Sequence, residues 1–399
     1  MNELIIYEFK PLFLTLDRIG PFRNFHTIDF TDKDNRPCNF YMMVSANGLG
    51  KTTALEIFCC LADLLGKTEI SSYGHEDLDR KGGRAQLDFR VRLRWQGRER
   101  TEVLSVVAGM VGEEVFLKSW PDSELSKFEA ENWHRSGFRS SVSGRYQPVS
   151  SLQDELLQDV YAAIRAGSGE AVNEHFLQPS FHLPTVLYFS AYRDIPPISN
   201  DHPGLGQTAF SSIRSISQPQ HWNYAPLHAF EAHNTLWENS LDNLVVWMKW
   251  LDNGSFETAQ KLINEQLFDG TPKMLKSVRK VPPEALIDAG DGETHRLDRL
   301  SSGEKSLAHL FLRIGAHATA NTIILIDEMD THLHILWAHR LYNALEDLAM
   351  EHPGFTIIMT THSSELLRRF AAGMDIAREG LYLGGELIEE KELSGQEGA

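Results

Sequence analysis

A short run of small residues between an apolar strand and an apolar helix constrains the fold of this chain more than any other sequence feature. Residues 39–44 form the apolar run expected of a buried strand. Residues 51–65 carry apolar side chains nearly all round, as in a helix packed inside a domain. The segment between them reads Ser45-Ala46-Asn47-Gly48-Leu49-Gly50-Lys51-Thr52-Thr53. With the later alternation of predicted strands and helices, it points to an α/β fold with a largely parallel sheet.

The residue types in this segment are suited to holding a phosphate. Gly48 and Gly50 let consecutive backbone N–H groups curl around an anion, and the helix that follows adds its positive N-terminal end. Lys51 would contact the β- and γ-phosphates of a nucleotide, and the hydroxyl of Thr52 would bind Mg²⁺. Ser45 stands where the usual motif has its first glycine. We therefore expect a nucleotide-binding loop made by Asn47, Gly48, Gly50, Lys51, Thr52 and Thr53.

A second apolar strand ends in two carboxylates. Residues 322–326 are followed directly by Asp327 and Glu328. Asp327 would hold Mg²⁺ together with Thr52, and Glu328 would orient and deprotonate the attacking water. Taken alone, the two acids are also compatible with a solvated strand end.

Two further motifs follow the same pattern of strand or helix ends. Leu300-Ser301-Ser302-Gly303-Glu304-Lys305-Ser306 opens an amphipathic helix, whose N-terminus could meet a γ-phosphate through Ser302 and Gly303. The same string is compatible with an ordinary helix cap that has Glu304 in the first turn. His362 follows the predicted strand 355–359 in the sequence Thr360-Thr361-His362-Ser363. A single histidine at a strand end is usually structural.

The order of the four motifs along the chain resembles that of ABC-type ATPases: Walker A, signature, Walker B and switch histidine. The resemblance covers about residues 1–110 and 281–375. It implies an ABC-type P-loop head with two lobes, in which helices flank the parallel sheet and an antiparallel β subdomain is added. It also implies ATP hydrolysis with Mg²⁺, with Glu328 and His362 as the catalytic pair. Two chains would enclose two ATP molecules, and Ser302 and Gly303 of one chain would complete the site of the other.

The spacing and one longer segment indicate a branch of this group. The 250 residues between Lys51 and Ser302 resemble the SMC, RecF and OLD group rather than transporters. The segment 325–334, LIDEMDTHLH, resembles the DExxxHLHP motif of OLD-like ATPases, including subunits of anti-phage systems such as Septu and PARIS. The chain departs from that pattern at Ile335 and Ser364, where the family has proline. The pair His332 and His334 could bind a metal, but contact across a dimer interface is the favoured interpretation.

These resemblances imply a switch protein that controls a partner effector, such as a nuclease encoded nearby, in anti-phage defence. A RecF-like DNA-repair ATPase and a nucleotide-bound scaffold with little turnover are the alternatives. The 37 residues after His362 are too few for a nuclease domain, so none is expected in this chain.

The expected domain organisation has four parts. Residues 1–115 form lobe I, and residues 116–280 form a mainly helical or irregular insertion with a returning strand near 186–190. Residues 281–375 form lobe II, and residues 376–399 form a C-terminal strand and an acidic tail. Within the insertion and lobe II, we expect helices at 228–251 and 256–268, a turn at Asp291-Gly292 and a helix that begins near Ser302.

Charge and composition limit the possible partners. The net charge of −17 argues against indiscriminate coating of nucleic acid, although a local basic track remains possible. Residues 85–95 predict a half-buried strand that turns at Gln96-Gly97. Its polar face carries Arg90, Arg92 and Arg94, and Arg98 and Arg100 after the turn extend this arginine face. We favour a solvated sheet face there over a nucleic-acid track. A second basic cluster, equally open, comprises Lys273, Lys276, Arg279 and Lys280.

Neither a secretory signal nor a stretch of roughly 20 apolar residues is found in the sequence. The three cysteines, Cys38, Cys59 and Cys60, form no disulfide framework. We therefore expect a cytoplasmic protein that does not contact a membrane.

Overall fold

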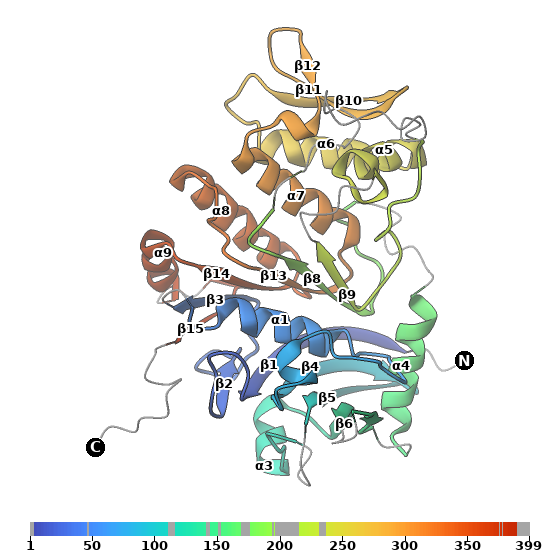
Figure 1. Ribbon diagram of the computed structural model, residues 1–399, viewed down its shortest axis with the longest axis vertical. Helices are drawn as coiled ribbons and strands as arrows, with labels where there is room; N and C mark the ends of the chain where they lie inside the picture. Colours follow the sequence, from blue (N-terminus) through green and yellow to red (C-terminus); the bar gives the residue numbers. More distant parts are fainter. Residues whose placement is uncertain are drawn as a thin grey trace.

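The computed structural model describes residues 4–45, 48–110, 116–140, 144–150, 153–168, 176–193, 195, 215–230, 237–374, 376 and 378–388. Within these residues the strands form two six-stranded sheets and one three-stranded sheet (Figure 1).

One six-stranded sheet is parallel throughout. Its strand order is β15-β3-β14-β13-β8-β9, and every neighbouring pair runs in the same direction. The strands are β3 (Phe40–Ser45), β8 (Pro184–Phe189), β9 (Leu227–Phe230), β13 (Asn321–Ile326), β14 (Thr356–Thr361) and β15 (Leu383–Ile388). Because the strands are parallel, the segments that follow β3, β8, β13 and β14 meet at one edge of the sheet.

The second six-stranded sheet is mainly antiparallel, with the order β2-β1-β4-β5-β6-β7. Only the pair β5 and β6 runs parallel among its neighbours. The strands are β1 (Ile5–Asp17), β2 (His26–Asp29), β4 (Arg84–Trp95), β5 (Arg98–Gly109), β6 (Trp133–Ser140) and β7 (Tyr146–Pro148). The predicted turn at Gln96-Gly97 is confirmed, with φ of 50° and 78° as a two-residue hairpin turn requires.

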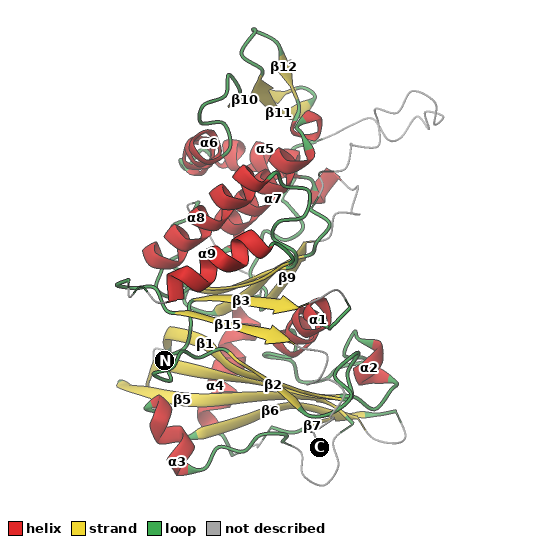
Figure 2. Ribbon diagram, turned by 90° about the vertical axis from the view of Figure 1, so that its left-hand side faces the viewer, coloured by secondary structure: helices red, strands yellow, loops and turns green. Residues whose placement is uncertain are grey.

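The helices form two layers around the parallel sheet. Helix α1 (Lys51–Ala62) lies between the two large sheets, whereas α7 (Ser302–His317), α8 (Ile335–Glu351) and α9 (Ser364–Met374) cover the other face (Figures 1 and 2). Beyond α7 lie α5 (Leu241–Leu251), α6 (Ser255–Gln266) and the small sheet of β10 (Met274–Lys280), β11 (Pro283–Asp288) and β12 (Thr294–His295). Helix α4 (Glu155–Gly167) packs beside the antiparallel sheet. The short helices are α2 (Glu76–Asp79), α3 (Asp122–Leu125), η1 (Ser126–Phe128), η3 (Trp237–Asn239) and η4 (Leu297–Arg299).

The parallel strands are apolar because both of their faces are buried. In β13, Ile323 and Leu325 point into the core shared with α1 and the antiparallel sheet. Ile324 and Ile326 point into the core shared with α7 and α8. Alternate residues of one strand therefore serve two cores, as in sheets covered by helices on both sides. The predicted α/β class, with a parallel sheet and an antiparallel subdomain, is confirmed.

Residues 116–280, expected to be mainly helical or irregular, contain more strand than that. Strands β6 and β7 extend the antiparallel sheet, β8 and β9 extend the parallel sheet, and β10 begins the small sheet. The strand expected near 186–190 is confirmed as β8, and the helix expected at 256–268 as α6. The additional strands are stabilised by partners distant in sequence, so their local pattern is weak.

The prediction of a helix at 228–251 is wrong for the first half of that segment. Residues 227–230 form strand β9, which pairs with β8. The helix begins only at Leu241, where the side chain of Ser240 accepts a hydrogen bond from the backbone N–H of Asn243 at 3.0 Å. This serine cap is a recognisable helix start that the periodicity alone did not reveal.

The lobe II expectations are closer to the structure. The turn at Asp291-Gly292 joins β11 to β12, and α7 begins at Ser302. The C-terminal strand expected within 376–399 is β15, and its Glu386 lies 3.0 Å from the Nε2 atom of His26. Residues 389–399 lie outside the described residues. No helix within the described part is both long and apolar enough to cross a membrane.

Candidate ATP-binding site

The predicted phosphate loop connects β3 to α1 at the carboxyl edge of the parallel sheet. Gly50 has a φ of 99°, and a Cβ atom there would lie 2.6 Å from the ring of Phe22. A side chain is therefore excluded both by conformation and by space. Gly48 also has positive φ, at 79°. Asn47, predicted to bind nucleotide, lies outside the described residues.

Lys51 donates two hydrogen bonds to Ser45 at the mouth of the loop. Its Nζ atom donates to the carbonyl oxygen and to the Oγ atom of Ser45, each at 2.9 Å. The serine that replaces the usual glycine therefore binds the lysine directly. Burial lowers the pKa of Lys51, and the nearby carboxylates of Asp327 and Glu328 oppose this shift. A lysine bonded in this way can exchange its acceptors for phosphate oxygens.

The two residues predicted to bind Mg²⁺ are in contact. The Oγ1 atom of Thr52 donates to Oδ2 of Asp327 at 2.7 Å, and the Oγ1 atom of Thr360 donates to Oδ1 at 2.7 Å. Asp327 is only 2% exposed, so its orientation is fixed by these two hydroxyls. A hydroxyl and a carboxylate side by side next to a phosphate loop fit Mg²⁺, which prefers oxygen ligands.

Glu328 and His362 meet at the open side of the site. The Oε1 atom of Glu328 lies 3.3 Å from Nε2 of His362, and Oε2 accepts a hydrogen bond from Thr331 at 2.7 Å. Glu328 has a φ of 45°, a conformation uncommon for any residue other than glycine. Its backbone N–H donates to Oγ1 of Thr360 at 2.7 Å. The carboxylate can thus face a water molecule beside a bound phosphate.

These groups surround one cavity of about 470 Å³. It is lined by Gly48, Gly50, Lys51, Thr52, Thr53, Glu328 and His362. Three separate parts of the sequence, predicted from their motifs alone, therefore come together around a space next to the phosphate loop.

The signature segment lies elsewhere. Ser301 caps α7 through a reciprocal pair with Glu304, in which the N–H of Ser301 donates to Oε2 at 2.9 Å. Ser302 is exposed at the helix tip, and Ser302 and Gly303 are not among the residues that line the phosphate cavity of their own chain. Helix α7 covers the face of the parallel sheet opposite to α1 (Figures 1 and 2). The tip is both an ordinary helix cap and an exposed N-terminus.

His332 and His334, adjacent to this tip in space, are exposed. A Cβ atom at Gly303 would lie 3.4 Å from the side chain of Leu333 and 3.7 Å from the carbonyl oxygen of His332. Among the described residues, no three His, Cys, Asp or Glu side chains are grouped as a metal site would require. The histidine pair and the signature thus share one surface.

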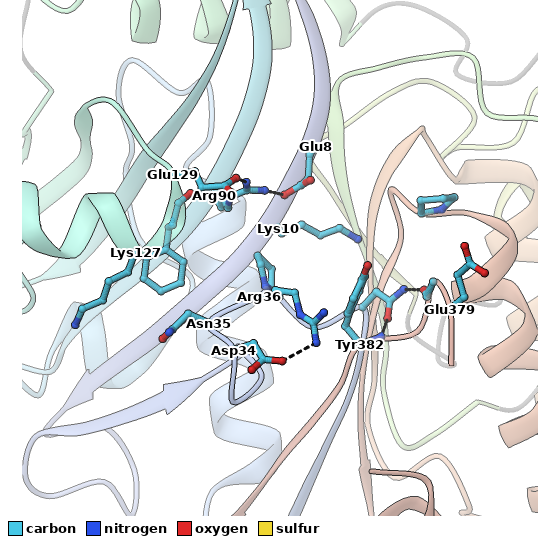
Figure 3. A pocket seen from close by; sticks show the side chains of 15 residues that line it. Glu8, Lys10, Asp34, Asn35, Arg36, Arg90, Lys127, Glu129, Glu379 and Tyr382 are labelled. Atoms are coloured by element: carbon cyan, nitrogen blue, oxygen red, sulfur yellow. Dashed lines mark hydrogen bonds and ion pairs between the residues drawn. The ribbon is translucent and has the colours of Figure 1, made fainter. Parts of the chain in front are cut away.

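The arginine face is occupied by acidic partners. Arg90 pairs with Glu8 and, at 2.9 Å, with Glu129 (Figure 3), and Arg98 pairs with Glu131 at 2.9 Å. Arg92 and Arg94 are exposed. The beginning of this strand differs from the half-buried pattern expected for it. Gln86 and Asp88 on the polar face are fully buried there, because Gln86 binds the 117–118 backbone.

The other cations show the same pairing. Lys273 lies 2.9 Å from Glu304, Lys276 lies 2.7 Å from Asp288, and Arg279 lies 3.1 Å from Glu284. A cavity of about 570 Å³ beside Arg36, Arg90 and Tyr382 is larger than the phosphate cavity (Figure 3). Arg36 pairs with Asp34 at 3.0 Å in its wall. Arg90 and Lys127 in the same wall are also paired with carboxylates, and Lys10 donates to the carbonyl oxygen of Phe355.

Sequence reasoning did not single out Arg193. This residue follows β8 and is 3% exposed, and its Nη2 atom donates to the carbonyl oxygen of Glu328 at 2.8 Å. An arginine after an apolar strand is an ordinary feature of a sequence, so no local signal distinguishes it.

Comparison with known proteins gives one family model that matches part of the chain. A family model described as "AAA domain, putative AbiEii toxin, Type IV TA system" matches residues 193–368, which is less than half of the chain. This region contains the signature, Asp327, Glu328 and His362. No curated protein matches the sequence.

Three SMC head structures are similar to this chain at low levels. The SMC head domain from Thermotoga maritima has 15% identity and a TM-score of 0.37, and the match covers 90% of this chain and 91% of that one. An SmcHead bound to the C-winged helix domain of ScpA has 14% identity and a TM-score of 0.40, with the same coverage. An Smc head with an extended coiled coil, bound to the C-terminal domain of ScpA derived from Pyrococcus furiosus, has 12% identity and a TM-score of 0.38, again with 90% and 91% coverage.

The fold has a parallel sheet, an antiparallel sheet and flanking helices, the architecture expected from the resemblance to ABC-type P-loop ATPase heads. The family match over residues 193–368 and the motifs assembled around one cavity support an ATP-binding ATPase.

Proposed function

We propose that this chain is an ATP-hydrolysing switch whose ATP sites are each completed by a second copy of the chain. One observation carries the proposal. The phosphate cavity contains the loop, Glu328 and His362, whereas the signature tip with Ser302 and Gly303 is exposed and lies across the parallel sheet from α1. An exposed helix N-terminus with a partial positive charge can bind the phosphate of another chain.

Each residue of the site has a role in this proposal. Lys51 and the backbone N–H groups of Gly48 and Gly50 hold the phosphates, and Thr53 lies on the same wall. Thr52 and Asp327 would hold Mg²⁺, which supplies charge neutralisation when bound. Glu328 accepts a proton from the attacking water, and His362 lies 3.3 Å from Glu328 on the phosphate side.

ATP would close the dimer and hydrolysis would open it, so that a partner protein could be controlled by the two states. We place this switch in anti-phage defence, with an effector such as a nuclease encoded nearby, because segment 325–334 resembles the corresponding segment of OLD-like defence ATPases. The acidic partners of Arg90 and Arg98 favour this role over a DNA-binding repair protein.

Mixing two inactive variants tests the composite site. Gly303→Asp places an anion at the signature tip, and Lys51→Ala removes the phosphate lysine. A Cβ atom at Gly303 would have its nearest neighbour at 3.4 Å, so the fold accommodates the substitution. Gly303→Ala is the matched control without charge. We expect Gly303→Asp and Lys51→Ala each to be inactive alone. Their mixture should regain part of the turnover, because one of the two sites in a mixed dimer has both halves intact.

Turnover is measured on mixtures after subunit exchange has been shown by fluorescence transfer. Normal hydrolysis by Gly303→Asp alone would disprove the shared site. Light scattering measures the mass of the native protein and of Glu328→Gln with and without ATP. If both stay monomeric in the presence of ATP, the dimeric switch is disproved.

A further inference from the structure

The guanidinium of Arg193 lies where the ends of two parallel strands meet a helix. Its Nη1 atom donates to the carbonyl oxygens of Ser190 at 2.9 Å and of Asp327 at 2.5 Å. Its Nη2 atom donates to the carbonyl oxygen of Glu328 at 2.8 Å, and its Nε atom donates to Oγ of Ser306 at 3.1 Å. The planar guanidinium, whose N–H donors point in different directions like a fork, therefore joins the end of β8, the end of β13 and helix α7.

The partners of this buried cation are unusual. All four hydrogen-bond acceptors are neutral, and burial removes much of the solvation energy of the charge, which the nearby carboxylates of Asp327, Asp330 and Glu328 only partly offset. Burial lowers the pKa of Arg193 to about 10, so the side chain is still charged at neutral pH. The position of the charge next to the two chemically important residues gives it a role other than stability.

Glu328 depends on this fork for its conformation. Its φ of 45° lies in the left-handed region, which costs a non-glycine residue about 1 kcal/mol or more. Three hydrogen bonds hold its backbone there: the N–H donates to Oγ1 of Thr360, and the carbonyl oxygen accepts from Arg193 and from the N–H of Thr331 at 3.0 Å. A shift of the arginine would therefore move the backbone that aims the Glu328 carboxylate.

The contact with Ser306 connects this backbone to the signature helix. Ser306 is 3% exposed and lies four residues after Ser302, so both are on the same side of α7, one turn apart. The rest of α7, from Ser306 to His317, is buried, so a displacement of its exposed tip is transmitted along a rigid element. In the dimer proposed above, that tip contacts the ATP held by the partner.

We propose that Arg193 is a positioning residue that couples the two composite ATP sites, by joining the Glu328 backbone of one site to the helix that completes the other. This inference rests on the proposed dimeric switch. When a partner's ATP fixes the tip of α7, Ser306 holds the guanidinium, and the guanidinium holds Glu328 in position in its own site. ATP binding at one site thereby favours binding and hydrolysis at the other.

Ser306→Ala tests the coupling with the smallest change, since it removes one acceptor and leaves the three backbone contacts. Glu328→Gln protein, in which hydrolysis is blocked, is titrated with ATP by calorimetry, with and without Ser306→Ala. We expect a Hill coefficient that falls from nearly 2 to about 1, with less than about a threefold change in half-saturation. The same fall is expected for hydrolysis by protein with native Glu328. Ser136→Ala is the control, because it removes a buried hydroxyl that bonds to Tyr161 in the antiparallel sheet, and it should leave the coefficient unchanged.

Arg193→Lys keeps the charge but loses the fork, so it should abolish cooperativity and lower kcat at least about tenfold. Its ATP affinity should change less than about threefold. A Hill coefficient of about 1 in the native dimer, or an unchanged coefficient in Ser306→Ala, would overturn the coupling while leaving the dimeric switch intact. Failure of the switch itself is distinguished by the absence of an ATP-dependent dimer in light scattering.

Discussion

Cations beside the phosphate cavity and cations on the antiparallel sheet have different partners. This difference predicts which side chains affect ATP binding and which affect stability. Near the phosphate cavity, Lys51 bonds to a carbonyl and a hydroxyl of Ser45, and Arg193 bonds to three carbonyls and a hydroxyl. On the antiparallel sheet, Arg90 and His134 bond to carboxylates. Lys51, which lines the cavity, can exchange its acceptors for a phosphate, whereas Arg193 keeps its acceptors and holds the backbone beside Glu328. A cation already paired with a carboxylate gains little from an anion. We therefore expect changes near the cavity to affect ATP chemistry and changes on the antiparallel sheet to affect folding.

Glu328→Gln should have the largest effect. Loss of the base that accepts the water proton is expected to reduce turnover by roughly 10² or more. ATP binding should be kept, because the phosphates are held by other residues. Steady-state phosphate release and calorimetric ATP titration measure the two quantities. Undiminished turnover in this variant would falsify the role of Glu328.

Lys51→Ala should come next, and it should act on binding. Loss of a charge-assisted contact to the phosphates is expected to weaken ATP affinity about 10- to 100-fold. ATP-dependent dimerisation on a sizing column should be lost with it. Arg90→Ala is the matched control from the other sheet, with affinity expected to stay within about twofold. An equal loss of ATP affinity in Lys51→Ala and Arg90→Ala would contradict the expected difference between the two regions.

His134 provides a test of stability on the antiparallel side. Burial lowers its pKa, but hydrogen bonds and charge from Asp154 and Glu102 outweigh this and raise it to about 9. Because the folded pKa is raised above the ordinary value of 6.5, the stabilisation is fully present below pH 6.5. It is lost as pH rises through 9 and should amount to about 3 kcal/mol, since the pKa rises by about 2.5 and each pKa unit corresponds to about 1.4 kcal/mol.

Urea unfolding between pH 6 and 9 measures this loss, and His134→Gln should flatten the dependence. ATP affinity, measured at pH 6.5, should be the same in both proteins. A native protein with the same unfolding free energy at pH 6 and pH 9 would contradict the assignment.

The smallest effect is expected from the exposed arginines. Changing Arg92 and Arg94 to glutamate should alter ATP turnover by less than about twofold, since neither lines the phosphate cavity. Native protein should show no duplex binding even at low salt, because neighbouring acids neutralise this face. Binding that weakens with salt, and that the double variant abolishes, would instead show a nucleic-acid surface.

The motifs of the site could be predicted because each depends on local chemistry. The phosphate loop needs glycine at Gly50, where φ is 99° and a side chain would clash with Phe22. The helix that begins at Ser302 is predicted by the serine cap before it and by Glu304, and residues 321–326 form a fully buried strand whose last four residues are apolar. The order of these segments along the chain was enough to predict the fold class.

Other features depend on contacts between distant parts of the chain, and only the tertiary structure decided them. Residues 227–230 form a strand because β8 provides a partner about 40 residues earlier, although they fit a helical pattern equally well. Arg193 reaches Asp327 and Glu328 across 134 and 135 positions, and Arg90 reaches Glu8 across 82. The sequence determines the type of each side chain and its local backbone preference, but the acceptor that a buried charge finds is determined by how the sheets and helices pack.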